Sequence, residues 1–220
     1  MVYSIVAVVI AIVCTYFSYA YLTFRKKETK SVPTFFAVKF HKKVFLTSIV
    51  SLIGALVIYF LSRYSYDKSV IMSYLNLIAF IWIVAMGYID AEEKIIPHAL
   101  IGVGLAMWVI FVLAECMIAG LPLKYMLIYS LLGGGLCGGV LLIIATIGKS
   151  ALGMGDVKMF TAIGLLYGLS NTYTIILMSI IIMAVVSVIL LALKKVTRKT
   201  AVPMAPFVAI GFFICMLMGL

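Results

Sequence analysis

The sequence GYIDAEEKIIP occupies residues 87–97 and separates two long apolar runs of the chain. A second stretch, GMGDVK at residues 153–158, lies between apolar runs in the same way. Each stretch carries one aspartate, Asp90 or Asp156, close to a glycine or a proline. A carboxylate beside a bilayer is costly, so an aspartate at such a position indicates a function. The two stretches therefore predict breaks between membrane helices that together carry two acids.

The composition of the whole chain also indicates a membrane protein. Hydrophobic residues make up 66% of the 220 residues, and the mean hydropathy is +1.28. A soluble domain is nearer half apolar, so this chain has too little polar surface for a water-soluble globule. We expect an all-α fold, a polytopic membrane helix bundle of about eight transmembrane helices surrounded by membrane lipid. The expected helices cover residues 2–24, 44–62, 73–90, 98–119, 123–147, 157–170, 172–193 and 203–219.

The chain divides into two parts on this view. Residues 1–72 hold N-terminal membrane helices and a basic loop, and residues 73–220 hold both aspartates. The loop, residues 25–43, reads RKKETKSVPTFFAVKFHKK. Two alternatives are open for it: its aromatic residues favour a segment along the membrane surface, and its charges favour a solvated loop.

The distribution of basic residues predicts the orientation of the bundle. Fourteen lysines and arginines fall on the side of Asp90 and Asp156, and only Arg63, Lys68 and Lys124 fall on the other side. Cytoplasmic loops carry this excess of positive charge. We therefore expect a multi-pass protein of the plasma (inner) membrane, with the N-terminus outside and both aspartates on the cytoplasmic side. The same loops account for the net charge of +10, and no nucleic-acid-reading motif accompanies them.

Metal binding is not expected from the cysteines and histidines. The cysteines at positions 14, 116, 137 and 215 lie far apart within apolar runs, and none forms a C-x-x-C pair. His41 and His98 are isolated from one another. A structural zinc site needs four such ligands at short spacings. The sequence therefore predicts neither a metal nor another cofactor.

Two carboxylates at one site can hydrolyse a peptide bond through an activated water. The ionised carboxylate takes a proton from the water, and the protonated one donates a proton to the carbonyl oxygen. Like charges a few ångströms apart do not both ionise easily, so such a pair holds one proton between its members. Asp90 and Asp156 are 66 residues apart and lie on the same side of the predicted bundle, so we predict that they form this pair.

Residues next to the two aspartates are candidates for binding a substrate. We expect Gly153 and Gly155 to form a tight turn with backbone conformations closed to other residues, and to leave room for a substrate strand. Asp156 then falls near a helix N-terminus, where negative charge is favoured. Lys158 either pairs with a nearby group or extends to the membrane surface.

Two acids beside Asp90 leave two alternatives open. Glu92 and Glu93 follow Asp90 by two and three residues, without a glycine beside them. They are either solvated loop charges or contacts to the substrate, where they would attract basic residues.

Glycines in the expected helix 123–147 predict close helix packing. Gly134 and Gly138 are four residues apart, as are Gly135 and Gly139. Glycines at this spacing let a second helix approach closely. We expect a packing seam that helps to bring the ends of the third and sixth helices together.

Three segments in this order resemble the prepilin peptidase family, the membrane aspartyl proteases of type IV prepilins and preflagellins. The first is the aspartate of residues 90–97, followed by the pair Ile96–Pro97; the second is residues 153–158. The third is VPMAPFVAIG at residues 202–211. The resemblance spans roughly residues 73–217. It implies an aspartic endopeptidase that cleaves a short basic leader from prepilin-like precursors, with Asp90 and Asp156 as catalytic residues.

The long bacterial members of that family also methylate the new N-terminus, and they carry paired C-x-x-C sequences after the first helix. Residues 25–43 contain no cysteine. Because of this difference we do not expect N-methyltransferase activity, and the chain resembles the shorter, peptidase-only members more closely. Two other classes compete with this hypothesis: a membrane aspartyl protease that cuts helices within the bilayer, and a transporter with paired intramembrane acids. The chain has neither visible repeats nor acids in the middle of a predicted helix, which disfavours the transporter.

Overall fold

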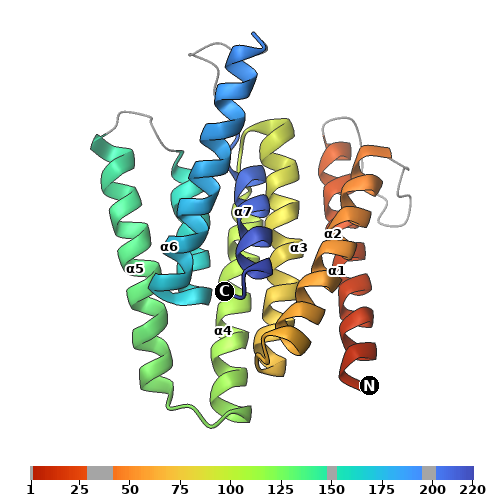
Figure 1. Ribbon diagram of the computed structural model, residues 1–220, viewed down its shortest axis with the longest axis vertical. Coiled ribbons are helices and arrows are strands. Elements are labelled where there is room, and N and C mark those ends of the chain that lie inside the picture. Colours follow the sequence, from red (N-terminus) through yellow and green to blue (C-terminus); the bar gives the residue numbers. More distant parts are fainter. Residues whose placement is uncertain (1, 29–41, 148–152, 195–201) are drawn as a thin grey trace.

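The computed structural model describes residues 2–28, 42–147, 153–194 and 202–220. In these ranges every regular element is a helix, without a β-strand, and the helices form one bundle (Figure 1). Six helices are long and apolar enough to cross a membrane, and α7 is shorter. The predicted polytopic membrane helix bundle is therefore confirmed. Its elements are α1 (Val2–Glu28), α2 (Lys42–Phe60), η1 (Leu61–Ser65), α3 (Val70–Glu93), α4 (His98–Ile118), α5 (Leu123–Ile147), α6 (Met154–Ala192) and α7 (Ala205–Leu217).

Helix α6 differs from the sequence prediction of two separate helices, 157–170 and 172–193. It is a single element of 39 residues with one non-helical residue inside, Gly168, at φ 71° and ψ −177°. This backbone conformation is essentially restricted to glycine. The chain reverses direction at Gly168, so that a first arm (154–167) runs down in the view of Figure 1 and a second arm (169–192) runs back up. The expected number of about eight helices is reached only if these arms are counted separately.

Helix α3 lies at the centre of the bundle. In its apolar window 67% of the residues are buried, compared with 33% or less in the other five long helices. Phe80 of α3 stacks on Phe212 of α7, and Phe212 meets the ring of Tyr167 edge-on. Side chains of α3, α7 and the first arm of α6 therefore share one core, which holds the three segments of the sequence motifs together.

A buried polar network fixes the lower end of the first arm. Asn76 of α3 donates a 3.1 Å hydrogen bond to Ser62 of η1, and the hydroxyl of Tyr167 donates a 3.0 Å hydrogen bond to the side-chain oxygen of Asn76. Asn76 is completely buried, so both of these bonds form where the local dielectric is low and an unpaired polar group would be costly. The network sets the height of the first arm relative to α3.

The glycines of α5 form the predicted packing seam, but only some of them take part. A Cβ atom added to Gly134 would lie 3.1 Å from the carbonyl oxygen of Thr161, and one added to Gly138 would lie 2.3 Å from the hydroxyl of Thr161. A Cβ atom added to Gly133 would lie 2.3 Å from the carbonyl oxygen of Gly164. In contrast, nothing lies within 4 Å of a Cβ atom on Gly135 or Gly139. The seam joins α5 to the first arm of α6.

Asp90 and Asp156 lie at the same end of the bundle, as the loop pattern predicts. The C-terminal end of α3 and the start of α6 are both in the upper part of Figure 1, whereas the N-terminus lies at the lower end. Which end faces the cytoplasm stays a prediction from the charge distribution, as does the division of the chain at residue 72. The basic loop at 25–43 falls mostly outside the described residues.

Candidate active site

Asp90 lies within the last turn of α3, because that helix continues to Glu93. Its side chain is buried, with 6% of its surface exposed. Lys94 ends the helix in a left-handed conformation (φ 56°), and its N–H donates a 2.8 Å hydrogen bond to the carbonyl oxygen of Asp90. The chain then turns through Ile96 and Pro97, both buried, into α4. Asp90 is therefore held in a rigid helix and not in a loop.

The N-terminus of α7 supplies the hydrogen-bond donor for Asp90. The backbone N–H of Ala205 donates a 2.9 Å hydrogen bond to Oδ2 of Asp90, and the N–H of Met204 interacts with the same carboxylate. The first N–H groups of a helix have no partner inside the helix, and they favour a negative charge. The sequence analysis singled out residues 202–211 only for their resemblance to a family motif and missed this contact.

Asp156 occupies the first turn of α6, as predicted. Gly153 is the N-cap of the helix, and Asp156 is three residues further on. The carboxylate accepts a hydrogen bond from the backbone of Gly153. This arrangement is one half of a capping box, in which the side chain of the third helical residue accepts a hydrogen bond from the backbone N–H of the N-cap residue. The helix start thus fixes the Asp156 side chain in the way that the start of α7 fixes Asp90.

The two aspartates, distant in sequence, are brought together by packing between their motifs. The carboxylate of Asp156 is close enough to that of Asp90 for the two to interact electrostatically. Gly155 packs against Ile96, with only 3.1 Å from a Cβ atom built on Gly155 to the Cβ of Ile96. The Ile-Pro pair after Asp90 therefore rests on the glycine before Asp156. Two acids and two helix N-termini converge at this point.

The expected role of Gly153 and Gly155 in a special backbone conformation is wrong. Gly153 has an ordinary extended conformation (φ −69°, ψ 139°), and the positive-φ glycines of the described chain are at positions 120, 168 and 219. What both positions require is space. A Cβ atom on Gly153 would lie 3.0 Å from Oδ2 of Asp156, and one on Gly155 would crowd Ile96. Glycine at position 153 leaves room for the Asp156 carboxylate, and glycine at position 155 leaves room for Ile96.

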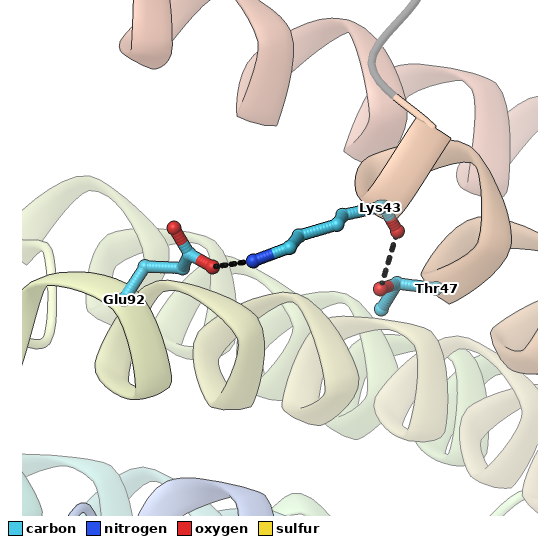
Figure 2. A network of polar contacts seen from close by, with 3 residues as sticks. All are labelled: Lys43, Thr47 and Glu92. Atoms are coloured by element: carbon cyan, nitrogen blue, oxygen red, sulfur yellow. Dashed lines mark hydrogen bonds and ion pairs between the residues drawn. The ribbon is translucent and has the colours of Figure 1, made fainter.

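The other predicted site residues lie on the helices that carry the two aspartates. Lys158 lies on the first arm of α6 and is exposed. Glu92 and Glu93 lie in the last turn of α3 and are exposed as well. Glu92 is not simply solvated, because its Oε1 lies 3.7 Å from Nζ of Lys43 at the start of α2 (Figure 2). The sequence analysis treated Lys43 as a loop charge and did not anticipate this ion pair.

Lys43 is itself anchored at the start of α2. Its carbonyl oxygen accepts a 2.9 Å hydrogen bond from the hydroxyl of Thr47, one turn further along the helix (Figure 2). The Lys43–Glu92 pair therefore links α2 to α3 at the same end of α3 as Asp90. Across the part of the chain that the structure describes, no three histidine, cysteine, aspartate or glutamate side chains are grouped as a metal site would require. The site offers carboxylates, helix N-termini and backbone N–H groups.

Comparison with known proteins adds a family relationship. The model of the type IV leader peptidase family matches residues 77–188, a range that contains both aspartates. A prepilin leader peptidase/N-methyltransferase of Pseudomonas putida is 27% identical over 147 residues, which is 62% of this chain and 47% of the relative. The protein of the same name from Xanthomonas campestris pv. campestris is 28% identical over 144 residues, 63% of this chain and 47% of the relative.

A third relative of this name, from Pseudomonas aeruginosa, is 26% identical over 143 residues, again 62% of this chain and 47% of the relative. This chain thus spans about half the length of the curated relatives it matches. No solved structure matches it significantly.

Proposed function

The chain belongs to the type IV leader peptidase family, and from this premise we propose that it is a membrane aspartyl endopeptidase. Its substrates are prepilin-like precursors, from which it removes a short basic leader. The observation that carries the proposal is the convergence of Asp90 and Asp156, each beside a helix N-terminus, at one end of an apolar bundle. The transporter hypothesis has no comparable support, because the two acids lie at helix ends and not near the middle of the bundle.

The reaction uses the two carboxylates and one water molecule. The ionised carboxylate of the pair takes a proton from the water molecule while the oxygen of that water attacks the carbonyl carbon of the scissile bond. The protonated carboxylate donates its proton to the carbonyl oxygen, which gives a neutral tetrahedral intermediate. When the C–N bond of this intermediate breaks, the carboxyl that received the water proton passes it to the leaving nitrogen. The proton on the oxygen returns to the other carboxylate, and the pair is restored.

The helix N-termini keep both acids in place for this exchange. A buried carboxylate needs compensating hydrogen bonds for its ionised form. Ala205 supplies such a bond to Asp90, and Gly153 supplies one to Asp156. Because the donors are backbone groups at the starts of α7 and α6, they do not have to reorganise during the reaction.

The remaining predicted residues contact the substrate in this proposal. An extended substrate strand contacts the backbone at Gly153 and Gly155, beside Asp156. Lys158 is exposed two residues after Asp156. Glu92 and Glu93 lie beyond Asp90 and face the basic leader. The excess of basic residues in the loops of this end supports a reaction at the cytoplasmic face of the inner membrane.

A cleavage assay with three variants tests the proposal. The purified protein, in lipid nanodiscs, is incubated with prepilin-like precursors encoded in the same genome, and the products are sequenced from their N-termini. The wild type is expected to release the leader, and Asp90→Asn and Asp156→Asn are expected to be inactive while still folding and inserting. Asp67→Asn is the matched control, since Asp67 is exposed and precedes α3 at the end opposite to Asp90. Normal turnover by either Asp90→Asn or Asp156→Asn would contradict the assignment.

A further inference from the structure

An apolar groove lies between α2, α3 and α7. Its volume is about 560 Å³, within the range of about 300–1,000 Å³ that is usual for binding sites. The wall includes Ile53 and Val57 of α2, Val84 of α3, and Ala209 and Phe213 of α7. The groove is thus built from helices of both parts of the chain, and α3 and α7 are the helices that hold Asp90.

One end of this groove adjoins the candidate active site. Ala91 and Pro206 line it there, and they directly follow Asp90 and Ala205, the residues joined by the hydrogen bond to the carboxylate. Thr47 lines the same end, one turn from Lys43 on α2. The groove therefore begins where the scissile bond would lie.

The length of the groove fits a short stretch of helix. Its lining on α2 extends from Thr47 to Val57, a rise of roughly 15 Å at 1.5 Å per residue. This is about half of the roughly 30 Å of hydrocarbon in a bilayer. A helix of about three turns has the same length. An occupant of the groove would run from the level of Asp90 toward the middle of the membrane.

The polarity and exposure of the lining indicate an occupant that arrives from the bilayer. Apart from Thr47 and Tyr88 near the active-site end, the lining residues are apolar. Val50, Ile53 and Ile210 along the groove are 57%, 58% and 47% exposed, so they face the surroundings of the bundle, which in a membrane protein are lipid. An apolar segment can therefore enter sideways without crossing a polar surface.

We propose that this groove binds the first turns of an apolar helix of the protein substrate, directly after the scissile bond. The inference rests on the proposed function and deepens it. A substrate chain that leaves the carboxylates within a bilayer must satisfy its own backbone hydrogen bonds, and a helix does so. Gly87 of α3 lets Pro206 of α7 pack closely, with 3.1 Å from a Cβ atom built on Gly87 to the Cα of Pro206, and Ala91 lines the groove at the same end, next to Asp90. The small side chain of Ala91 allows a helix in the groove to approach α3 closely at this end.

Two substrates separate groove binding from catalysis. One is a complete prepilin-like precursor with its apolar helix, and the other is a peptide that ends a few residues after the cleaved bond. The variant Val57→Trp fills the groove at the end far from Asp90. It is expected to raise KM severalfold for the complete precursor and to leave cleavage of the short peptide unchanged. Val188→Trp is the matched control, because Val188 is exposed on the second arm of α6 and does not line the groove.

Equal effects of Val57→Trp on both substrates, or no effect on either, would overturn the proposal. The proposed function is tested separately, since cleavage of the short peptide and its loss in Asp90→Asn do not depend on the groove. A photo-cross-linking residue in place of Ile53, in the inactive Asp156→Asn variant, measures directly what occupies the groove. Cross-links to the apolar segment of the precursor, absent from a probe at Val188, are expected. Cross-links to lipid alone would refute helix binding.

Discussion

The N–H of Ala205 donates a 2.9 Å hydrogen bond to Oδ2 of Asp90, across 115 residues of sequence. This bond makes α7 part of the candidate active site, although α7 carries no acid of its own. It also couples the position of a buried carboxylate to the packing of the C-terminal helix on α3. Asp156 is held by the start of its own helix instead, so the two acids have similar electrostatic surroundings but different mechanical supports.

The space beside Asp156 can be tested with a single methyl group. We expect Gly153→Ala to lower kcat, because the added Cβ atom would lie 3.0 Å from Oδ2 of Asp156 and displace the carboxylate. Displacements of about 1 Å in a catalytic group cost up to about 10²-fold in rate. Steady-state cleavage kinetics measure the effect. Gly102→Ala in α4 is the control, since nothing lies within 4 Å of a Cβ atom there. Equal kcat values for the two variants would show that Gly153 does not protect the geometry of Asp156.

Two neighbouring glycines of α5 are expected to respond differently when each is replaced by alanine, because only one of them lies in the seam with α6. A Cβ atom on Gly133 would lie 2.3 Å from the carbonyl oxygen of Gly164, a backbone atom that cannot rotate away. We expect Gly133→Ala to destabilise the protein by about 1–3 kcal/mol, as overpacking usually does. Gly135→Ala meets nothing within 4 Å, and it replaces glycine by a better helix former. Thermal unfolding in detergent should give a lower midpoint for the first variant and an unchanged or higher one for the second. Similar midpoints would argue against a tight seam.

The sequence was sufficient to predict the membrane helices and to single out two acids as candidates, because both inferences depend on local patterns. Hydropathy marks a membrane helix, and an aspartate at the end of an apolar run stands out from its surroundings. The reversal at Gly168 was predicted only approximately, between residues 170 and 172, since no proline or charge interrupts the apolar run there. Only the φ angle of 71° identifies the turning residue.

Other features of the site depend on packing, which the sequence does not reveal. Gly153 and Gly155 were expected to adopt unusual backbone angles, but they are needed for the space beside Asp156 and Ile96. The contact from Ala205 could not be anticipated, because every residue except proline carries the same N–H group. To predict the Lys43–Glu92 pair, one would have to know that the start of α2 lies beside the end of α3.

A chelator is expected to leave cleavage unchanged. The proposed chemistry needs only two carboxylates and water, and the described residues contain no cluster of three metal-binding side chains. The assay compares turnover before and after incubation with excess chelator, followed by dialysis. Loss of activity that added zinc or another divalent cation restores would mean that the reaction is metal-assisted and that the two-carboxylate mechanism is wrong.

Cleavage is expected to proceed without methylation of the product. The relatives reported above are named prepilin leader peptidase/N-methyltransferase, so methylation is the activity to be tested. The 220 residues contain no C-x-x-C pair of the kind that the methylating members carry. Mass spectrometry of the mature substrate, formed by this protein in the presence of S-adenosylmethionine, decides the matter. A product heavier by one methyl group would overturn the expectation, and the reaction without the methyl donor is the control.

Neutralising either member of the Lys43–Glu92 pair is expected to change leader binding in opposite directions. The lysine side chain is 80% exposed and the glutamate 38%, so a basic leader can compete with Lys43 for Glu92. Glu92→Gln, alone or with Glu93→Gln, should raise KM for a lysine-rich leader, and Lys43→Gln should lower it. Exposed pairs contribute about 0.2–1 kcal/mol, so the changes should be severalfold at most and smaller at high salt. Cleavage kinetics with a basic leader and with a neutral leader of the same length measure the difference. If KM for both leaders responds identically, the pair links α2 to α3 and takes no part in recognition.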